Sequence, residues 1–282
     1  MLVSWLLLQS SALTGTFRSP RVTESSGVVV SRAHPGTLWT HNDSGDGPYL
    51  YATDSLGNDH GAIRVSGAEA TDWEDLASGP CPSGRAGGSC LYIADTGDNL
   101  EHRKSVVIYA VLEPEPPLTA ADTQRVTAAA RVLRLRYPDG SHDVEAIYVS
   151  PRDTAVYLVS KGREGSISLY RVARTAWDSE FLVTAERLQT LPISPSRRLG
   201  RMVTGAAVRG DGAAVAIRTY VDVFFFQPGP DGRLVPSRRP VCSIAGVDRT
   251  GEAIAFRDDS TLVLTSEASA FGPGTVHTLR CP

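Results

Sequence analysis

Five short segments of the chain share one pattern of polar and apolar positions. Each contains a polar residue, which is followed by a small or acidic residue and then by alternating apolar residues. The segments are SSGVVV (25–30), WEDLAS (73–78), VEAIYV (144–149), VTGAAV (203–208) and GEAIAF (251–256). Aligned on the polar position, they place Ser26, Glu74, Glu145, Thr204 and Glu252 in register. An alternation with a period of two predicts a β-strand in each segment.

Further apolar strands follow each opening strand. The second strands are LWTHND (38–43), LYIADT (91–96), VYLVSK (156–161), AVAIRT (214–219) and LVLTSE (262–267). The third strands are YLYATD, VVIYAV, ISLYRV, DVFFFQ and VHTLRC. Weaker fourth strands are AIRVSG, RVLRLRY, LVTAERLQTL and RPVCSIA, and the N-terminal LLLQSSALTGTF (6–17) can supply the one that the last unit lacks.

A repeat of four strands predicts an all-β fold, a single β-propeller. Five four-stranded blades fit the repeat best, with the ring closed by the N-terminal strand, and six blades remain an alternative. Closure by the opposite terminus removes the open sheet edge of a repeat array. A sandwich of repeated hairpins fits less well, because it does not require similar polar residues at each strand start.

The organisation that follows is an N-terminal segment over residues 1–19 and a propeller over residues 20–282. The first segment is a closing strand, a remnant of a signal peptide, or both, although it lacks a basic start. A net charge of −3 and the absence of a basic stripe argue against nucleic acid as a partner. No apolar run reaches the roughly 18 residues that cross a bilayer, so no membrane partner is expected. We expect a monomer that acts on a small molecule.

The four cysteines predict two disulfides. Cys81 and Cys90 bracket a glycine-rich loop, and Cys242 and Cys281 lie in late strands that can be neighbours. An even count without a C-x-x-C motif favours disulfides over a zinc site, and free buried thiols are the alternative. Disulfides in turn predict a secreted or otherwise extracytoplasmic protein.

The aligned polar positions predict an acidic ring, because the opening strand of each propeller blade lines the central channel. Glu74, Glu145 and Glu252 would face one another there and repel one another unless hydrated, protonated or bound to a cation. An oxygen-only set of ligands suits a divalent cation, with Ca²⁺ favoured over Mg²⁺. The alternative is a water-filled channel whose glutamates cap the strand ends.

The ends of the second strands supply candidate catalytic residues beside this ring. Asp43 and Asp95, in the loops HNDSGD and DTGDN, are candidate further ligands or bases. Lys161 and Arg218 are candidate clamps for an anionic substrate. His41, or alternatively His142, is a candidate general acid or base, because an imidazole titrates near neutral pH.

The motifs ESSGVVVS, LWTHNDSGD, DWEDLA, LYIADTGDN, HDVEAIYV and VTGAAV with GDGAAVAIRTY together resemble a bacterial family of mostly uncharacterised, often secreted β-propellers. The resemblance covers about residues 20 to 270. A looser similarity, centred on DVEAIYV, extends to phytase-like and lactonase-like propellers. It implies a cation held by acidic residues in or near the channel, and hydrolysis of a phosphoester or lactone.

The sequence therefore favours an enzyme, a metal-dependent hydrolase that acts on a phosphoester, lactone or other ester. A non-catalytic propeller that binds a ligand or protein remains an alternative, as does a lyase or cyclase of a biosynthetic pathway. Fold alone does not decide among them.

Overall fold

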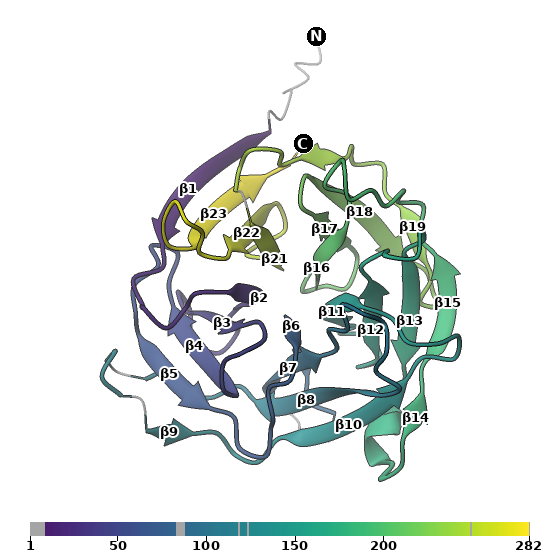
Figure 1. Ribbon diagram of the computed structural model, residues 1–282, viewed down its shortest axis with the longest axis horizontal. Coiled ribbons are helices and arrows are strands. Elements are labelled where there is room, and N and C mark those ends of the chain that lie inside the picture. The colour runs from purple at the N-terminus through teal and green to yellow at the C-terminus, as the bar shows by residue number, and fades with distance from the viewer. Residues whose placement is uncertain (1–8, 83–87, 118, 123, 249, 282) are drawn as a thin grey trace.

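The computed structural model describes residues 9–82, 88–117, 119–122, 124–248 and 250–281. Five sheets surround one axis and form a five-bladed β-propeller (Figure 1). The innermost strands are β2 (Ser25–Val30), β6 (Trp73–Pro80), β11 (Val144–Val149), β16 (Val203–Val208) and β21 (Gly251–Phe256). All five coincide with the repeated segments of the sequence. The all-β prediction and the count of five blades are confirmed, so the six-bladed alternative is excluded.

The outer strands follow in antiparallel order. Blade 1 continues through β3 (Leu38–Asn42), β4 (Tyr49–Thr53) and β5 (Gly61–Arg64). Blade 2 continues through β7 (Ser89–Asp95), β8 (Val106–Leu112) and β10 (Arg131–Arg136). Blade 3 contains β12 (Val156–Ser160), β13 (Ser168–Val172) and β15 (Glu186–Thr190). Blade 4 contains β17 (Val215–Thr219) and β18 (Asp222–Pro228), and blade 5 contains β22 (Thr261–Ser266) and β23 (Thr275–Arg280).

The N-terminal strand closes the ring, as the sequence predicts. Strand β1 (Ser10–Thr16) pairs antiparallel with β23 and becomes the outermost strand of blade 5. The expectation of a signal remnant rests partly on residues 1–8, which lie outside the described residues.

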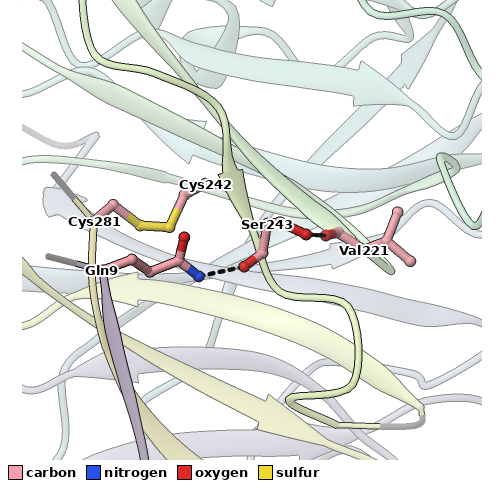
Figure 2. Close-up of a disulfide and its surroundings, with 5 residues drawn as sticks. All are labelled: Gln9, Val221, Cys242, Ser243 and Cys281. Carbon is pink, nitrogen blue, oxygen red and sulfur yellow. Dashed lines mark hydrogen bonds between the residues drawn. A yellow bond between two sulfur atoms is a disulfide. The ribbon is translucent and has the colours of Figure 1, made fainter.

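A disulfide between Cys242 and Cys281 links the end of blade 5 to blade 4 (Figure 2). Beside it, the side-chain amide of Gln9 donates a hydrogen bond to the backbone carbonyl of Ser243. Cys81 and Cys90 form a second disulfide, which joins β6 to β7. Both predicted pairings are confirmed. The bond between Cys242 and Cys281 lies close to the strand that closes the ring.

The outer edges differ from the sequence-based expectation. In blade 4 the fourth strand is divided into β19 (Leu234–Pro236) and β20 (Cys242–Ser243), and both pair with β18. Only β20 lies within the predicted RPVCSIA. Pro236 is the last residue of β19, and Pro240 lies before β20. Proline has no N–H group with which to continue the hydrogen bonds of a strand.

Two short strands join neighbouring blades at their outer edges. Strand β9 (Arg125–Val126) follows β8 of blade 2 but pairs in parallel with β5 of blade 1. Strand β14 (Val183–Thr184), which follows the 3₁₀-helix η1 (Arg174–Asp178), pairs in parallel with β10 of blade 2. These crossings were not predicted, because two-residue strands carry no periodic signal.

The core lies between the blades rather than at the axis. One buried cluster joins Tyr92 and Ile108 of blade 2 to Ile147 and Leu158 of blade 3, and similar clusters fill the other blade interfaces. The two faces of each blade therefore both carry apolar side chains. Within the part of the chain that the structure describes, no helix is long and apolar enough to cross a membrane.

Candidate metal centre

Each innermost strand contains a register irregularity near its start, and these irregularities position the repeated polar residues. The pairing shifts between Ser25 and Gly27 in β2, and equivalent shifts occur at the starts of β6, β11, β16 and β21. A β-bulge re-aims the side chains of the bulged strand. The polar residue of every repeat lies within its bulge, so the predicted ring gathers at one end of the channel.

Two groups of carboxyl oxygens meet at this end. The first comprises Asp43, Asp72 and Glu74, and the second comprises Glu74, Asp143 and Glu145. Within each group the oxygens lie within 4.8 Å of one another, and Glu74 belongs to both. Glu74 and Glu145 are each only 3% exposed, so water screens them weakly. This arrangement brings together three blades that are far apart in sequence.

The second group is neutralised by the protein itself. The ammonium of Lys161, which follows β12, donates a hydrogen bond to Glu145 Oε1. The guanidinium of Arg163 pairs in the same way with Asp143 Oδ2. In contrast, Asp43, Asp72 and Glu74 form no ion pair with a basic side chain among the described residues. The first group therefore holds the unbalanced negative charge of the site.

The pKa values reflect this imbalance. Burial, followed by repulsion from Asp43, raises the pKa of Asp72 to about 6. Burial, followed by repulsion from Glu145, raises the pKa of Glu74 well above its usual value. Burial also raises the pKa of Asp43. Without a counter-ion, burial and mutual repulsion therefore favour the protonated forms of these carboxyl groups, and a bound cation would favour the ionised forms.

The DTGDN loop shapes the first group. Asp95, which is 1% exposed, accepts hydrogen bonds from the backbone N–H groups of Thr71 (3.1 Å) and Asp72 (3.3 Å) and pairs with Arg103 at 2.7 Å. A Cβ on Gly97 would lie 2.5 Å from Asp72 Cγ and would overlap Glu74 Oε1. Asp95 therefore holds the segment that carries Asp72, and Gly97 leaves the space that the carboxyl groups occupy.

The polar residues of the HNDSGD loop have two roles: some stabilise the loop by hydrogen bonds, and one belongs to the acidic group. The Asn42 carboxamide oxygen accepts backbone hydrogen bonds from Thr23 and Glu24, both at 3.0 Å. Its nitrogen donates to Asp46 Oδ2 at 2.8 Å. Asn42 and Asp46 thus build the loop, and Asp43 contributes the side chain that reaches the acidic group.

Glu252 lies on the other side of the channel mouth. It is 8% exposed, and its Oε2 is buried without a hydrogen-bond partner among the described residues. Burial, followed by repulsion from Glu145, raises its pKa well above the usual value. The three glutamates predicted to face one another therefore share one electrostatic environment, although Glu252 is not a member of either group of close oxygens.

The side chains of Arg218 and His41 are buried between blades. The Arg218 guanidinium is fully buried, pairs with Asp248 at 2.8 Å, and donates to the carbonyl of Ala253 at 2.7 Å. It therefore joins blade 4 to blade 5. The His41 imidazole is also fully buried and packs edge-on against Trp73, and burial lowers its pKa to about 4. His142 lies farther out, with Nε2 3.0 Å from Asp139.

Sequence reasoning missed Asp72 and Asp143. Both precede a ring glutamate by two positions, in the strings DWE (72–74) and DVE (143–145). This D-x-E repeat was the available signal. Only the glutamates were singled out, because only they align across the strands.

Asp75 was also missed, and it occupies the centre of the ring. It is fully buried, and its Oδ2 accepts the backbone N–H groups of Ile147 (2.8 Å) and Ala206 (3.2 Å) from two other blades. Its Oδ1 accepts the N–H of Leu76 at 2.8 Å. The position after the polar residue is small in the other repeats: Gly27, Ala146, Gly205 and Ala253. These small residues leave room at the axis for one carboxyl group.

Comparisons with known proteins add little beyond the fold. No protein-family model matches the chain, and no curated protein matches it. Among solved structures, the chain is similar to the β-propeller domain of Cps50 (Swd1) from Myceliophteria thermophila. The identity is 13% and the TM-score is 0.46, over 95% of this chain and 99% of that one.

Proposed function

We propose that this propeller binds one divalent cation, Ca²⁺ in preference to Mg²⁺, between Asp43, Asp72 and Glu74. We further propose that it is an extracytoplasmic hydrolase of an anionic ester or lactone. The observation that carries the proposal is the convergence of three carboxyl groups within 4.8 Å, with no described basic side chain paired to them. Near the same mouth, Glu252 Oε2 is a buried acceptor with no hydrogen-bond partner among the described residues.

The ligand chemistry favours a hard cation. All members of the group are carboxylates, and the cysteines of the described chain are bound in disulfides. Carboxylate oxygens suit Ca²⁺ and Mg²⁺, whereas zinc in proteins usually takes nitrogen or sulfur ligands. The three carboxyl groups come from a loop and from both sides of a strand start, which suits the flexible geometry of Ca²⁺ better than the strict octahedron of Mg²⁺.

The surrounding residues fit an anionic substrate. A cation at this position would polarise a phosphoryl or carbonyl oxygen. Lys161, whose side chain is 13% exposed, and Arg163, at 15%, present positive charge beside the acidic group. Since Lys161 is held by Glu145, its ammonium is oriented before a substrate arrives. The motif resemblance to phytase-like and lactonase-like propellers agrees with this assignment.

The proposed location rests on the disulfides. Two disulfides include every cysteine of the chain. Such bonds persist in oxidising compartments and are rare in the cytosol.

The cation half is tested by calorimetric titration of the protein with Ca²⁺ and Mg²⁺ after treatment with EDTA. We expect one Ca²⁺ per chain and no measurable binding in Glu74→Gln, because that residue belongs to both groups of oxygens. Glu180→Gln removes an exposed carboxylate elsewhere and is the matched control. A wild-type protein that binds neither ion would overturn the assignment.

The hydrolase half is tested on aryl phosphates, aryl esters and lactones, with and without EDTA. Activity that requires Ca²⁺ and is lost in Glu145→Gln supports the enzyme, because Glu145 holds Lys161 in place. Ca²⁺ binding without turnover of any substrate class would refute the hydrolase and leave a cation-stabilised binding module.

A further inference from the structure

The channel has a second compartment at the end opposite the acidic group. A cavity of about 250 Å³ lies between the later halves of the inner strands and the hairpin turns that follow them. Its lining includes Leu76, Ala206 and Ile254, and none of the carboxyl groups of the proposed cation site. Nothing in the proposed function uses this cavity.

Asp75 separates the two compartments. Its carboxyl group is bonded to three inner strands and is fully buried, and the cavity begins at the next residue, Leu76. On the facing strand, a Cβ at Gly27 would lie 2.5 Å from the Leu76 nitrogen, so β2 and β6 are in close contact at this level. A ligand in the cavity would therefore not reach the acidic mouth.

The inner part of the cavity wall carries apolar side chains, which suit a small hydrophobic body. Val28, Ala77, Ala207 and Ala255 are buried residues of its lining, and Phe256 is half-buried. An apolar cavity of about 150 Å³ is large enough to hold benzene. By simple proportion, this one has room for about ten non-hydrogen atoms.

The entrance of the cavity carries arginines. Arg32, Arg209 and Arg257 line it together with Asp258 and Asp259. Arg209 is held by Asp211, and Asp258 accepts backbone hydrogen bonds from Ser260 (2.9 Å) and Thr261 (2.8 Å) within its own turn.

Two of the arginines at the entrance are not paired with a described acidic side chain. Arg32 and Arg257 are exposed and form no side-chain ion pair with another described residue. Below them, Tyr148 also lines the cavity, and its buried hydroxyl has no partner in the described part of the chain. Positive charge thus lies at the entrance, beside the apolar inner wall of the cavity.

From these features we infer that the cavity binds a monocarboxylate with a compact apolar body, of the size of octanoate. The apolar body would fill the space between the inner strands. The carboxylate would lie at the entrance, near Arg32 and Arg257. This site is independent of the proposed cation site.

The test is calorimetric titration with octanoate, octan-1-ol and octylamine in the presence of EDTA. We expect octanoate to bind more tightly than octan-1-ol, and octylamine to bind least. Removing both charges in the Arg32→Ala, Arg257→Ala double variant should weaken octanoate about fivefold and leave octan-1-ol unchanged, since exposed charge pairs contribute modestly. Arg238→Ala, an exposed arginine elsewhere, is the matched control.

Filling the cavity tests its location. Ser78→Leu adds volume at a half-buried lining position without removing a described side-chain hydrogen bond, and should abolish octanoate binding. Val30→Phe does the same from another blade and serves if the first variant does not fold. Absence of octanoate binding to the wild type, or binding that survives cavity filling, overturns the site. Equal affinities for octanoate and octan-1-ol overturn the anionic ligand class.

Discussion

Replacing Asp75 with alanine is expected to weaken the ring at its centre. The substitution removes the acceptor of three backbone N–H groups, that of Leu76 in the same strand and those of Ile147 and Ala206 in other blades. A buried N–H left without a partner costs about 1–3 kcal/mol, so three such groups cost about 3–9 kcal/mol. This is a large fraction of the roughly 5–15 kcal/mol that stabilises an ordinary domain.

Asparagine at the same position separates hydrogen bonding from charge. Its carbonyl oxygen can still accept the two N–H groups from the other blades, so we expect less than half of the alanine loss. Burial raises the pKa of Asp75 well above its usual value, outweighing the three hydrogen bonds that lower it. A raised folded-state pKa gives stability that is present below the unfolded pKa, about 4, and lost as the pH rises. Asp75→Asn should therefore improve relative to the wild type as the pH increases above about 4.

The assay is urea denaturation followed by tryptophan fluorescence, with the midpoint and slope compared among the variants. Asp259→Ala removes a carboxylate that is 89% exposed and serves as the control. An alanine variant within about 0.5 kcal/mol of the wild type, the range of ordinary surface substitutions, would refute the reasoning.

Three further predictions concern the cation site and the ring closure. The pKa of Asp72 is raised to about 6, so the metal-free protein should lose stability as the pH rises from about 4 to 7. Over the same range, the stabilisation of the protein by saturating Ca²⁺ should increase. Parallel melting curves with Ca²⁺ and with EDTA would contradict this. Gly97→Ala should weaken Ca²⁺ binding by displacing Asp72 and Glu74, with a normal circular dichroism spectrum, and unchanged affinity would count against the geometry. Replacing both Cys242 and Cys281 with serine opens a loop with a sequence separation of 39 residues. The free energy of unfolding, measured in urea, should fall by roughly 4 kcal/mol. A loss below about 1 kcal/mol would show that strand pairing alone closes the ring.

Part of the candidate site was predictable because it repeats. The starts of equivalent strands carry Glu74, Glu145 and Glu252. The alignment of these glutamates predicts that they face one axis. Asp43 was predicted from its place after a second strand, and it lies in the same acidic group as Glu74. The roles of these residues in binding or catalysis stay predictions.

Other roles depended on partners that no local pattern identifies. Arg218 lies inside β17 and pairs with Asp248 in a blade interface, whereas Lys161 follows β12 and pairs with Glu145 at the channel mouth. The two basic residues therefore occupy different register positions: Arg218 pairs with Gly205 inside its sheet, and Val159 takes the equivalent position in blade 3. The predicted alignment of the strand ends does not resolve this offset.

By itself, the sequence predicted the inner strands and most of the outer ones, five blades with six as the alternative, the closure by the N-terminal strand, and two disulfides, all of which the structure bears out. These features follow from short-range alternation and from repeat spacing, which can be read along the chain. Only the tertiary structure decided that Asp72 and Asp143 join the acidic groups, that Asp75 occupies the axis, and that a cavity lies beyond it. The physical reason is that these residues acquire their neighbours only when the ring closes, and the contacts then join strands tens of residues apart.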